Sequence, residues 1–170
     1  MSLLCKIVKM LACDDEVKTN TPIEKVPLIR AKVMEIAKSQ VGEKEIPGRK
    51  HNPDIVKYWK AVNNIKVSDD ETPWCAAFVN WCLLEAGLPG TGKANARSFM
   101  KWGEPTSNPQ EGDIVVYWRV KKNGWQGHVG FFSHFEKNLI VTLGGNQSNE
   151  VRFSRYSKDK LLGFRKVDRV

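Results

Sequence analysis

A cysteine stands near the start of an apolar segment, in the stretch TPWCAAFVNWC at residues 72–82. Thr72 is a typical N-cap and Pro73 a typical first helical residue, so the pattern predicts a helix that runs to Gly87 with Cys75 in its first turn. Unpaired N–H groups and the helix dipole would lower the pKa of a thiol there. The stretch therefore predicts a nucleophile, with the backbone N–H of Cys75 as an oxyanion donor. A buried, unreactive cysteine is the alternative.

A cysteine nucleophile needs a base, and histidine is the usual one. His128 follows Gly127 and opens the stretch HVGFFSHF, whose alternation predicts a strand. The glycine would let another backbone or a substrate come close. We therefore expect His128 to be the base that faces the thiol. Strict alternation along this strand would place Phe132 and Phe135 on opposite faces.

The base needs a polar partner that orients its ring. The stretch LIVTLGGNQSN offers Asn146 and Gln147 just after a predicted strand. We expect Asn146 to be the partner, while simple turn chemistry is the alternative explanation for this stretch. Asp113 is the competing carboxylate, although its place before a strand is more typical of a turn former.

The cysteines and the other histidines do not form a metal-binding pattern. Cys75 and Cys82 would lie about 10.5 Å apart along one helix, which is too far for a disulfide and wider than a pair of metal ligands requires. His51 lies in a charged loop, and His134 lies near the far end of its strand. We expect neither of them in the active site, and we expect no structural zinc.

The order of the elements predicts the fold class. Helical patterns come first and alternating, strand-like patterns follow, which indicates an α+β fold with helices packed on an antiparallel sheet. The helices are expected at 27–41, 53–62, 73–87 and 94–103, and the strands at 114–120, 128–135, 139–143, 151–156 and 161–167. Polar residues at 14–26 indicate a linker, so we divide the chain into an arm and linker (1–26) and one domain (27–170).

Composition sets further limits. The chain has 170 residues, is 41% hydrophobic and carries a net charge of +8, so it can bury one ordinary core and attract anionic partners. The N-terminal stretch MSLLCKIVKMLAC is interrupted by Lys6 and Lys9, so it does not predict a secretion signal. No stretch reaches the roughly 18 apolar residues of a membrane span. We expect synthesis in the cytoplasm, reduced thiols and no stable membrane insertion.

The motifs TPWCAAFVNWCL, GDIVVYW, GHVGFF and GGNQ, in this order, resemble those of the papain-like NlpC/P60 and CHAP superfamily of peptidoglycan hydrolases. The resemblance extends over roughly residues 28–167 and is greatest to a branch found in phage lysins and bacterial cell-wall enzymes. It implies a papain-like fold, Cys75 as nucleophile, His128 as base and Asn146 as the third residue. The implied reaction is hydrolysis of an amide through a thioester, by an endopeptidase or an N-acetylmuramoyl-L-alanine amidase. It requires no cofactor.

Two tryptophans flank these residues, and we expect Trp74 and Trp125 to line the substrate cleft, with core packing as the alternative for each. The expected partner is peptidoglycan, bound by a monomer, and not nucleic acid. Without a secretion signal, the enzyme would reach the cell wall or periplasm through a phage holin or a secretion machine such as type VI. A secreted antibacterial effector of that kind would have a cognate immunity protein.

Other functions remain open at this stage. The same thiol chemistry could serve a protein-directed cysteine protease, a deamidase or an acyltransferase. A basic nucleic-acid-binding domain without enzymatic activity is the remaining alternative. It is disfavoured because the aromatic residues lie in apparent core segments rather than between basic residues.

Overall fold

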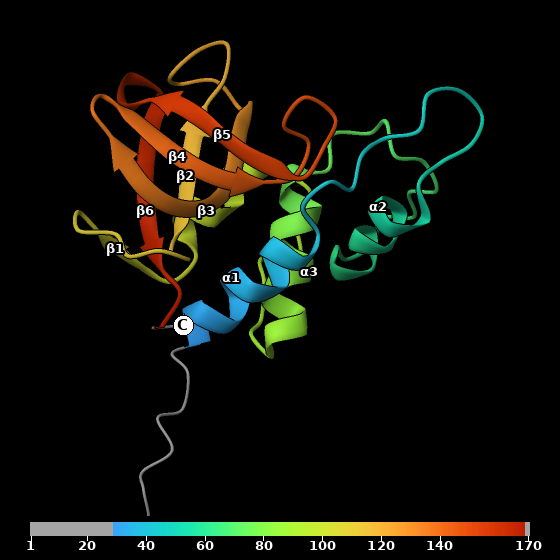
Figure 1. Cartoon of the computed structure of the whole chain (residues 1–170), viewed down its shortest axis with the longest axis horizontal. Coiled ribbons are helices and arrows are strands. Elements are labelled where there is room, and N and C mark those ends of the chain that lie inside the picture. The colour runs from blue at the N-terminus through green and yellow to red at the C-terminus, as the bar shows by residue number, and fades with distance from the viewer. Residues whose placement is uncertain (1–28, 169–170) are drawn as a thin grey trace, which may run out of the picture.

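The computed structural model describes residues 29–168 (Figure 1). The predicted arm and linker at 1–26, and Pro27 at the start of the first predicted helix, lie outside the described residues. Across 29–168 there is no helix of the length and apolarity that crossing a membrane requires.

Helices form the first half of the described chain. They are α1 (Ile29–Ser39), α2 (Pro53–Tyr58), the 3-10 turn η1 (Trp59–Ala61), α3 (Cys75–Ala86) and the 3-10 helix η2 (Ala96–Lys101). Asn52 caps α2 as its residue type predicts, since its side chain accepts a hydrogen bond from the N–H of Asp54. Gly87 ends α3 in the left-handed conformation, with a φ of 91° that glycine adopts without strain.

The predicted start of α3 is wrong by two residues. The helix begins at Cys75, with Trp74 as its N-cap. Thr72 does not cap it, because the N–H of Thr72 donates to Oδ1 of Asp69 at 2.7 Å and belongs to a separate turn. Cys75 is therefore the first residue of the helix rather than the third.

Strands form the second half. They are β1 (Glu104–Thr106), β2 (Ile114–Trp118), β3 (Gly127–Glu136), β4 (Leu139–Gly144), β5 (Arg152–Ser157) and β6 (Leu161–Lys166), with the 3-10 turn η3 (Lys158–Lys160) before β6. They make one antiparallel sheet in the order β1-β6-β2-β3-β4-β5. The predicted α+β class is confirmed. Strand β1 was not predicted, since three residues with a proline carry too little pattern.

The sheet curves over the helices, so that α1 and α3 lie side by side beneath it and α2 lies further out (Figure 1). The main core lies between these layers, where α3 packs against β3 and the ring centroids of Phe78 and Phe131 lie 6.3 Å apart. A smaller core covers the other face of the sheet. Its buried members are Val115, Tyr117, Phe132, Ile140 and Phe164.

The alternation predicted along β3 fails beyond Phe132. The register with β4 shifts between Phe132 and His134, which inserts a bulge into the strand. Phe135 consequently lies on the same face as Phe132, and the two ring centroids are 4.8 Å apart. The side chains of β3 alternate between the two faces as predicted only in the first half of the strand, which contains His128.

Candidate active site

The site begins with Cys75, which is only 7% exposed and stands at the first position of α3. The first N–H groups of a helix have no partner within the helix. The backbone N–H groups of Val129, Ala76 and Cys75 itself all lower the pKa of the thiol, so they face the sulfur. Val129 follows His128 directly, and the sulfur therefore lies against the start of β3.

The expected low pKa of this thiol is wrong for the protein without substrate. Burial raises the pKa of Cys75 above its ordinary value, and the backbone N–H groups and the charge of Arg119 only partly oppose that effect. At neutral pH the resting residue is thus a thiol. The donors around its sulfur remain able to stabilise negative charge that develops during a reaction.

His128 is the second residue of β3 and is 3% exposed. It pairs in register with Tyr117 of β2. A Cβ on the preceding Gly127 would lie 2.9 Å from the carbonyl oxygen of Tyr117, so only glycine permits this approach of the two strands. Burial lowers the pKa of His128 to about 4, while the contact with Gln147 opposes that shift. The imidazole is therefore neutral at neutral pH.

The side chain of Gln147 contacts this imidazole. Its Oε1 lies 3.2 Å from Nε2 of His128. Its Nε2 donates to the backbone carbonyl oxygens of Thr142, at 3.3 Å, and of Arg152. Because both carbonyls can only accept, the amide presents its oxygen to the ring, and Nε2 of His128 must carry the proton. The other ring nitrogen, Nδ1, is then left unprotonated and able to accept a proton.

The partner contact expected of Asn146 is made by Gln147 instead. Asn146 adopts a left-handed φ of 55° in the turn after β4, and it is partly exposed. That conformation turns the chain so that the next side chain, Gln147, points into the protein and becomes buried. Asn146 and Gln147 are both candidates from the sequence, but the direction of a side chain in such a turn depends on its backbone angles.

A second glycine brings this turn against α3. A Cβ on Gly145 would lie 2.3 Å from Cζ3 of Trp74 and 2.8 Å from Cβ of Phe78. Only a residue without a Cβ can therefore pack the turn against the start of the helix. This contact joins the Gln147 side of the site to the Cys75 side.

Tyr156 of β5 is a further site residue, and sequence reasoning did not predict it. Its ring stacks on the imidazole of His128, with centroids 5.2 Å apart and planes inclined by 26°. The same ring also stacks on that of Tyr117, with centroids 4.5 Å apart. Burial raises the pKa of the Tyr156 phenol, and the nearby thiol of Cys75 adds to that effect. No motif marks this tyrosine, and β4 lies between its strand and β3 in the sheet.

Two hollows adjoin these residues. One of about 250 Å³ is lined by Cys75, Asn95, Trp125 and their neighbours. Another of about 350 Å³ is lined by His128, Asn146, Gln147 and Tyr156. Arg119 and Val120 line both hollows, so the loop after β2 separates them.

The two predicted cleft tryptophans differ in position. Trp125 is 73% exposed and lines the hollow at Cys75. Trp74 is completely buried, so the prediction that it lines the cleft is wrong. Its ring packs against Tyr58 at 5.8 Å, and its Nε1 donates to Glu45 at 2.9 Å. Trp74 is part of the main hydrophobic core, which is the alternative to lining the cleft.

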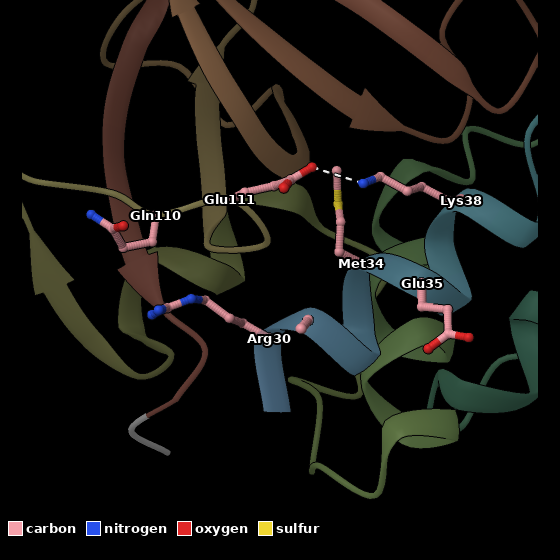
Figure 2. A pocket seen from close by; sticks show the side chains of 7 residues that line it. Arg30, Met34, Glu35, Lys38, Gln110 and Glu111 are labelled. Atoms are coloured by element: carbon pink, nitrogen blue, oxygen red, sulfur yellow. Dashed lines mark hydrogen bonds and ion pairs between the residues drawn. The ribbon is translucent and has the colours of Figure 1, made fainter. Parts of the chain in front are cut away.

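A larger hollow, of about 510 Å³, lies elsewhere, between α1 and the segment before β2 (Figure 2). Lys38 and Glu111 form an ion pair across it at 2.8 Å, and both side chains are about half exposed. Cys75, His128 and Gln147 are all absent from its lining. Volume alone therefore does not locate the chemistry in this protein.

The remaining candidates, Asp113 and Cys82, have structural roles. Asp113 is buried and accepts hydrogen bonds from the N–H groups of Gln110 and Val167, so it closes a turn. Cys82 is fully buried in α3, and burial raises its pKa well above the ordinary value. Within residues 29–168 no group of three or more His, Cys, Asp or Glu residues is arranged so that it could hold a metal ion.

A cysteine at the start of a buried helix, packed against a histidine-bearing antiparallel sheet, defines a papain-like α+β protein. Residues 67–146 match the model of the CHAP domain family, and this confirms the resemblance to the NlpC/P60–CHAP superfamily. CHAP domains are typically hydrolases that act on peptidoglycan. The chain has no significant match among curated proteins.

Proposed function

We propose that this protein hydrolyses an amide bond in the peptide part of peptidoglycan, as an endopeptidase or an N-acetylmuramoyl-L-alanine amidase. Cys75 is the nucleophile and His128 the general base. Gln147, in the place first expected for Asn146, holds the ring of His128 in the required tautomer. The reaction needs no metal or organic cofactor.

In the first step the Sγ–H proton of Cys75 passes to Nδ1 of His128 as the sulfur attacks the scissile carbonyl carbon. The backbone N–H groups at the start of α3, with Cys75 first among them, donate to the oxyanion. His128 returns the proton to the leaving amine, which departs and leaves a thioester on Cys75. Water, deprotonated by His128, then attacks the thioester and releases the acid and the free thiol.

The observation that carries this proposal is the set of hydrogen bonds that Gln147 makes beside His128. The amide of Gln147 occupies Nε2 and leaves Nδ1 as the basic nitrogen. The resting thiol and the neutral imidazole favour attack assisted by a general base over a preformed ion pair, because burial disfavours both charged forms.

The test uses purified sacculi and mass analysis of the released muropeptides. The wild-type protein should release peptides or stems, and the Cys75→Ala and His128→Ala proteins should release none while keeping the wild-type circular dichroism spectrum. Cys82→Ala is the matched control, since it removes the other described thiol and should retain activity. Undiminished release by the Cys75→Ala protein would end the proposal.

The alternative substrates are tested in the same preparation. A protein-directed protease, deamidase or acyltransferase should modify members of a protein panel and leave sacculi intact. The masses of the muropeptides also decide between the two proposed bonds, because an amidase releases whole stem peptides and an endopeptidase releases shortened or separated ones.

We also propose that the enzyme acts outside the cytoplasm, on the cell wall or in the periplasm. It would serve there as a phage lysin or as a secreted antibacterial effector. Neighbouring genes distinguish the two settings. Holin genes would indicate a lysin, whereas secretion-spike and immunity genes would indicate an effector that binds an immunity protein.

A further inference from the structure

Arg119 stands between the two hollows that adjoin the catalytic residues. It lines the hollow that contains Cys75 and also the one that contains His128. Its side chain is exposed, and across residues 29–168 no hydrogen bond or ion pair of its guanidinium group is found. An arginine without a partner, at the boundary of a reaction site, is able to bind a ligand there.

The charge of the Arg119 guanidinium group shifts the pKa values of three titratable residues in the site. It lowers the pKa of the Cys75 thiol, of the His128 imidazole and of the Tyr156 phenol. Such shared influence requires the cation to lie close to all three groups, because charge interactions in water decay within about 10 Å.

The surroundings of Arg119 favour an anion. The two hollows contain one further cation, Lys160, whose Nζ lies 3.5 Å from the ring centroid of Trp118. Neither hollow is lined by an aspartate or a glutamate. A peptide group that carries negative charge would therefore meet two cations and no opposing carboxylate.

The loop that carries Arg119 is built to hold a defined shape. The side chain of Arg97 donates from Nε to the carbonyl oxygen of Gln126 at 2.9 Å, and from Nη2 to those of Lys121 and Lys122. The N–H of Arg119 donates to the same carbonyl of Gln126 at 3.3 Å. The guanidinium group thus projects from a braced loop, which lowers the entropy that binding would cost.

Val120 gives a second, independent indication that this loop meets a ligand. It adopts a φ of 60°, which is strained for a β-branched residue, and it is 74% exposed. Strained backbone of this kind is concentrated at ligand-binding sites. An exposed valine next to an unpaired arginine suits a peptide that presents a methyl or methylene group beside a charge.

We infer that Arg119 determines specificity by binding a free carboxylate of the stem peptide next to the scissile amide. The inference rests on the proposed function. A planar guanidinium group matches a carboxylate with two parallel hydrogen bonds, which neither a carboxamide nor a lysine reproduces. Stem peptides carry such carboxylates on their glutamyl residue and at their C-terminus, and some carry one on the diamino acid, so the protein would distinguish free from amidated stems.

The test measures binding without catalysis. The Cys75→Ala protein is titrated calorimetrically with a synthetic tetrapeptide stem, and then with a set in which each free carboxylate in turn is replaced by a carboxamide. One replacement should weaken binding by about 10- to 100-fold. The Cys75→Ala/Arg119→Gln protein should bind all the peptides equally weakly, and Arg119→Lys should recover only part of the difference.

Arg155→Gln is the charge-matched control, because this exposed arginine pairs with Glu136 and lines neither hollow. In the Cys75→Ala background it should leave the preference for the carboxylate unchanged. Equal affinity of the Cys75→Ala protein for every peptide of the set, or an unchanged preference after Arg119→Gln, would overturn the inference. Neither result would affect the proposed hydrolysis, which is judged by release from sacculi.

Discussion

Oε1 of Gln147 lies 3.2 Å from Nε2 of His128, while the amide nitrogen of Gln147 donates to two backbone carbonyl oxygens. The glutamine therefore cannot rotate its amide without losing both hydrogen bonds, and it holds the imidazole in one tautomer. A neutral amide does this without adding charge, so burial still keeps the pKa of His128 at about 4. The base is thus unprotonated over the whole neutral range.

Removal of this amide should reduce catalysis. We expect Gln147→Ala to lower kcat by about 10²-fold, because the ring loses its tautomer preference. Asn146→Ala, as the neighbouring control, should lower kcat by less than about threefold. The measurement is the initial rate of release from sacculi, with circular dichroism to check the fold. A greater loss for Asn146→Ala than for Gln147→Ala would restore Asn146 as the partner.

The pH dependence of kcat/KM follows from His128. Its folded pKa is about 4, so the imidazole accepts the thiol proton above that pH and is protonated below it. Activity should therefore fall as the pH decreases through about 4 and should change little between pH 6 and 7 on account of this residue. Gln147→Glu places a carboxylate beside the ring and should move this acid limb to higher pH. An acid limb near 6.5 in the wild-type protein would contradict the burial of this residue.

Tyr156 should act on His128 through stacking and burial rather than through its hydroxyl group. Tyr156→Phe keeps the ring and should leave the pKa of His128 low. Tyr156→Ala opens the imidazole to water and should raise that pKa toward its ordinary value of 6.5. The measurement is an NMR titration of the His128 ring protons in each variant. Equal shifts in the two variants would indicate that the hydroxyl group is responsible.

Stability at acid pH should depend on Asp70. This completely buried residue accepts hydrogen bonds from the N–H groups of Ile46 and Asn52, and it contacts His51. Burial alone would raise the pKa of Asp70, but these contacts lower it to about 2. A lowered pKa contributes stability that is complete above the unfolded value and is lost as the pH falls toward 2.

The Asp70→Asn substitution should therefore reduce the free energy of unfolding at pH 7 by about 2 kcal/mol and flatten its decrease in acid. Asp54→Asn is the control, since Asp54 is half exposed and pairs with Lys57 on the surface. Urea denaturation at pH 7 and at pH 3 measures both effects. An equal loss in the two variants would refute a special role for the buried carboxylate.

Gly145 should not tolerate a side chain. A Cβ there would overlap the buried ring of Trp74, so Gly145→Ala should push the turn away from α3 and cost about 1–3 kcal/mol of stability. Because the same turn carries Gln147, kcat should fall as well. Gly163→Ala is the milder control, since its Cβ would meet the flexible end of Met100 at 3.1 Å. Thermal unfolding of both proteins, together with their rates, checks this prediction.

Much of the architecture follows from local patterns along the chain. The apolar segment around Cys75 predicts a buried helix, and the alternation after Gly127 predicts a strand that opens with His128. The order of helices and strands predicts the α+β class. The bulge after Phe132 was not predictable, because a bulge depends on the register of two strands that lie apart in the sequence.

Residue type and spacing by themselves determine that this protein has a cysteine at a helix start and a histidine at a strand start. Only the tertiary structure decides how those groups behave. Burial raises the pKa of Cys75, against the effect of the helix start, and the turn conformation selects Gln147 over Asn146. Packing buries Trp74 in the core, and the tertiary fold stacks the ring of Tyr156 on that of His128. Solvent exclusion and side-chain direction depend on neighbours from distant segments, and no local pattern encodes them.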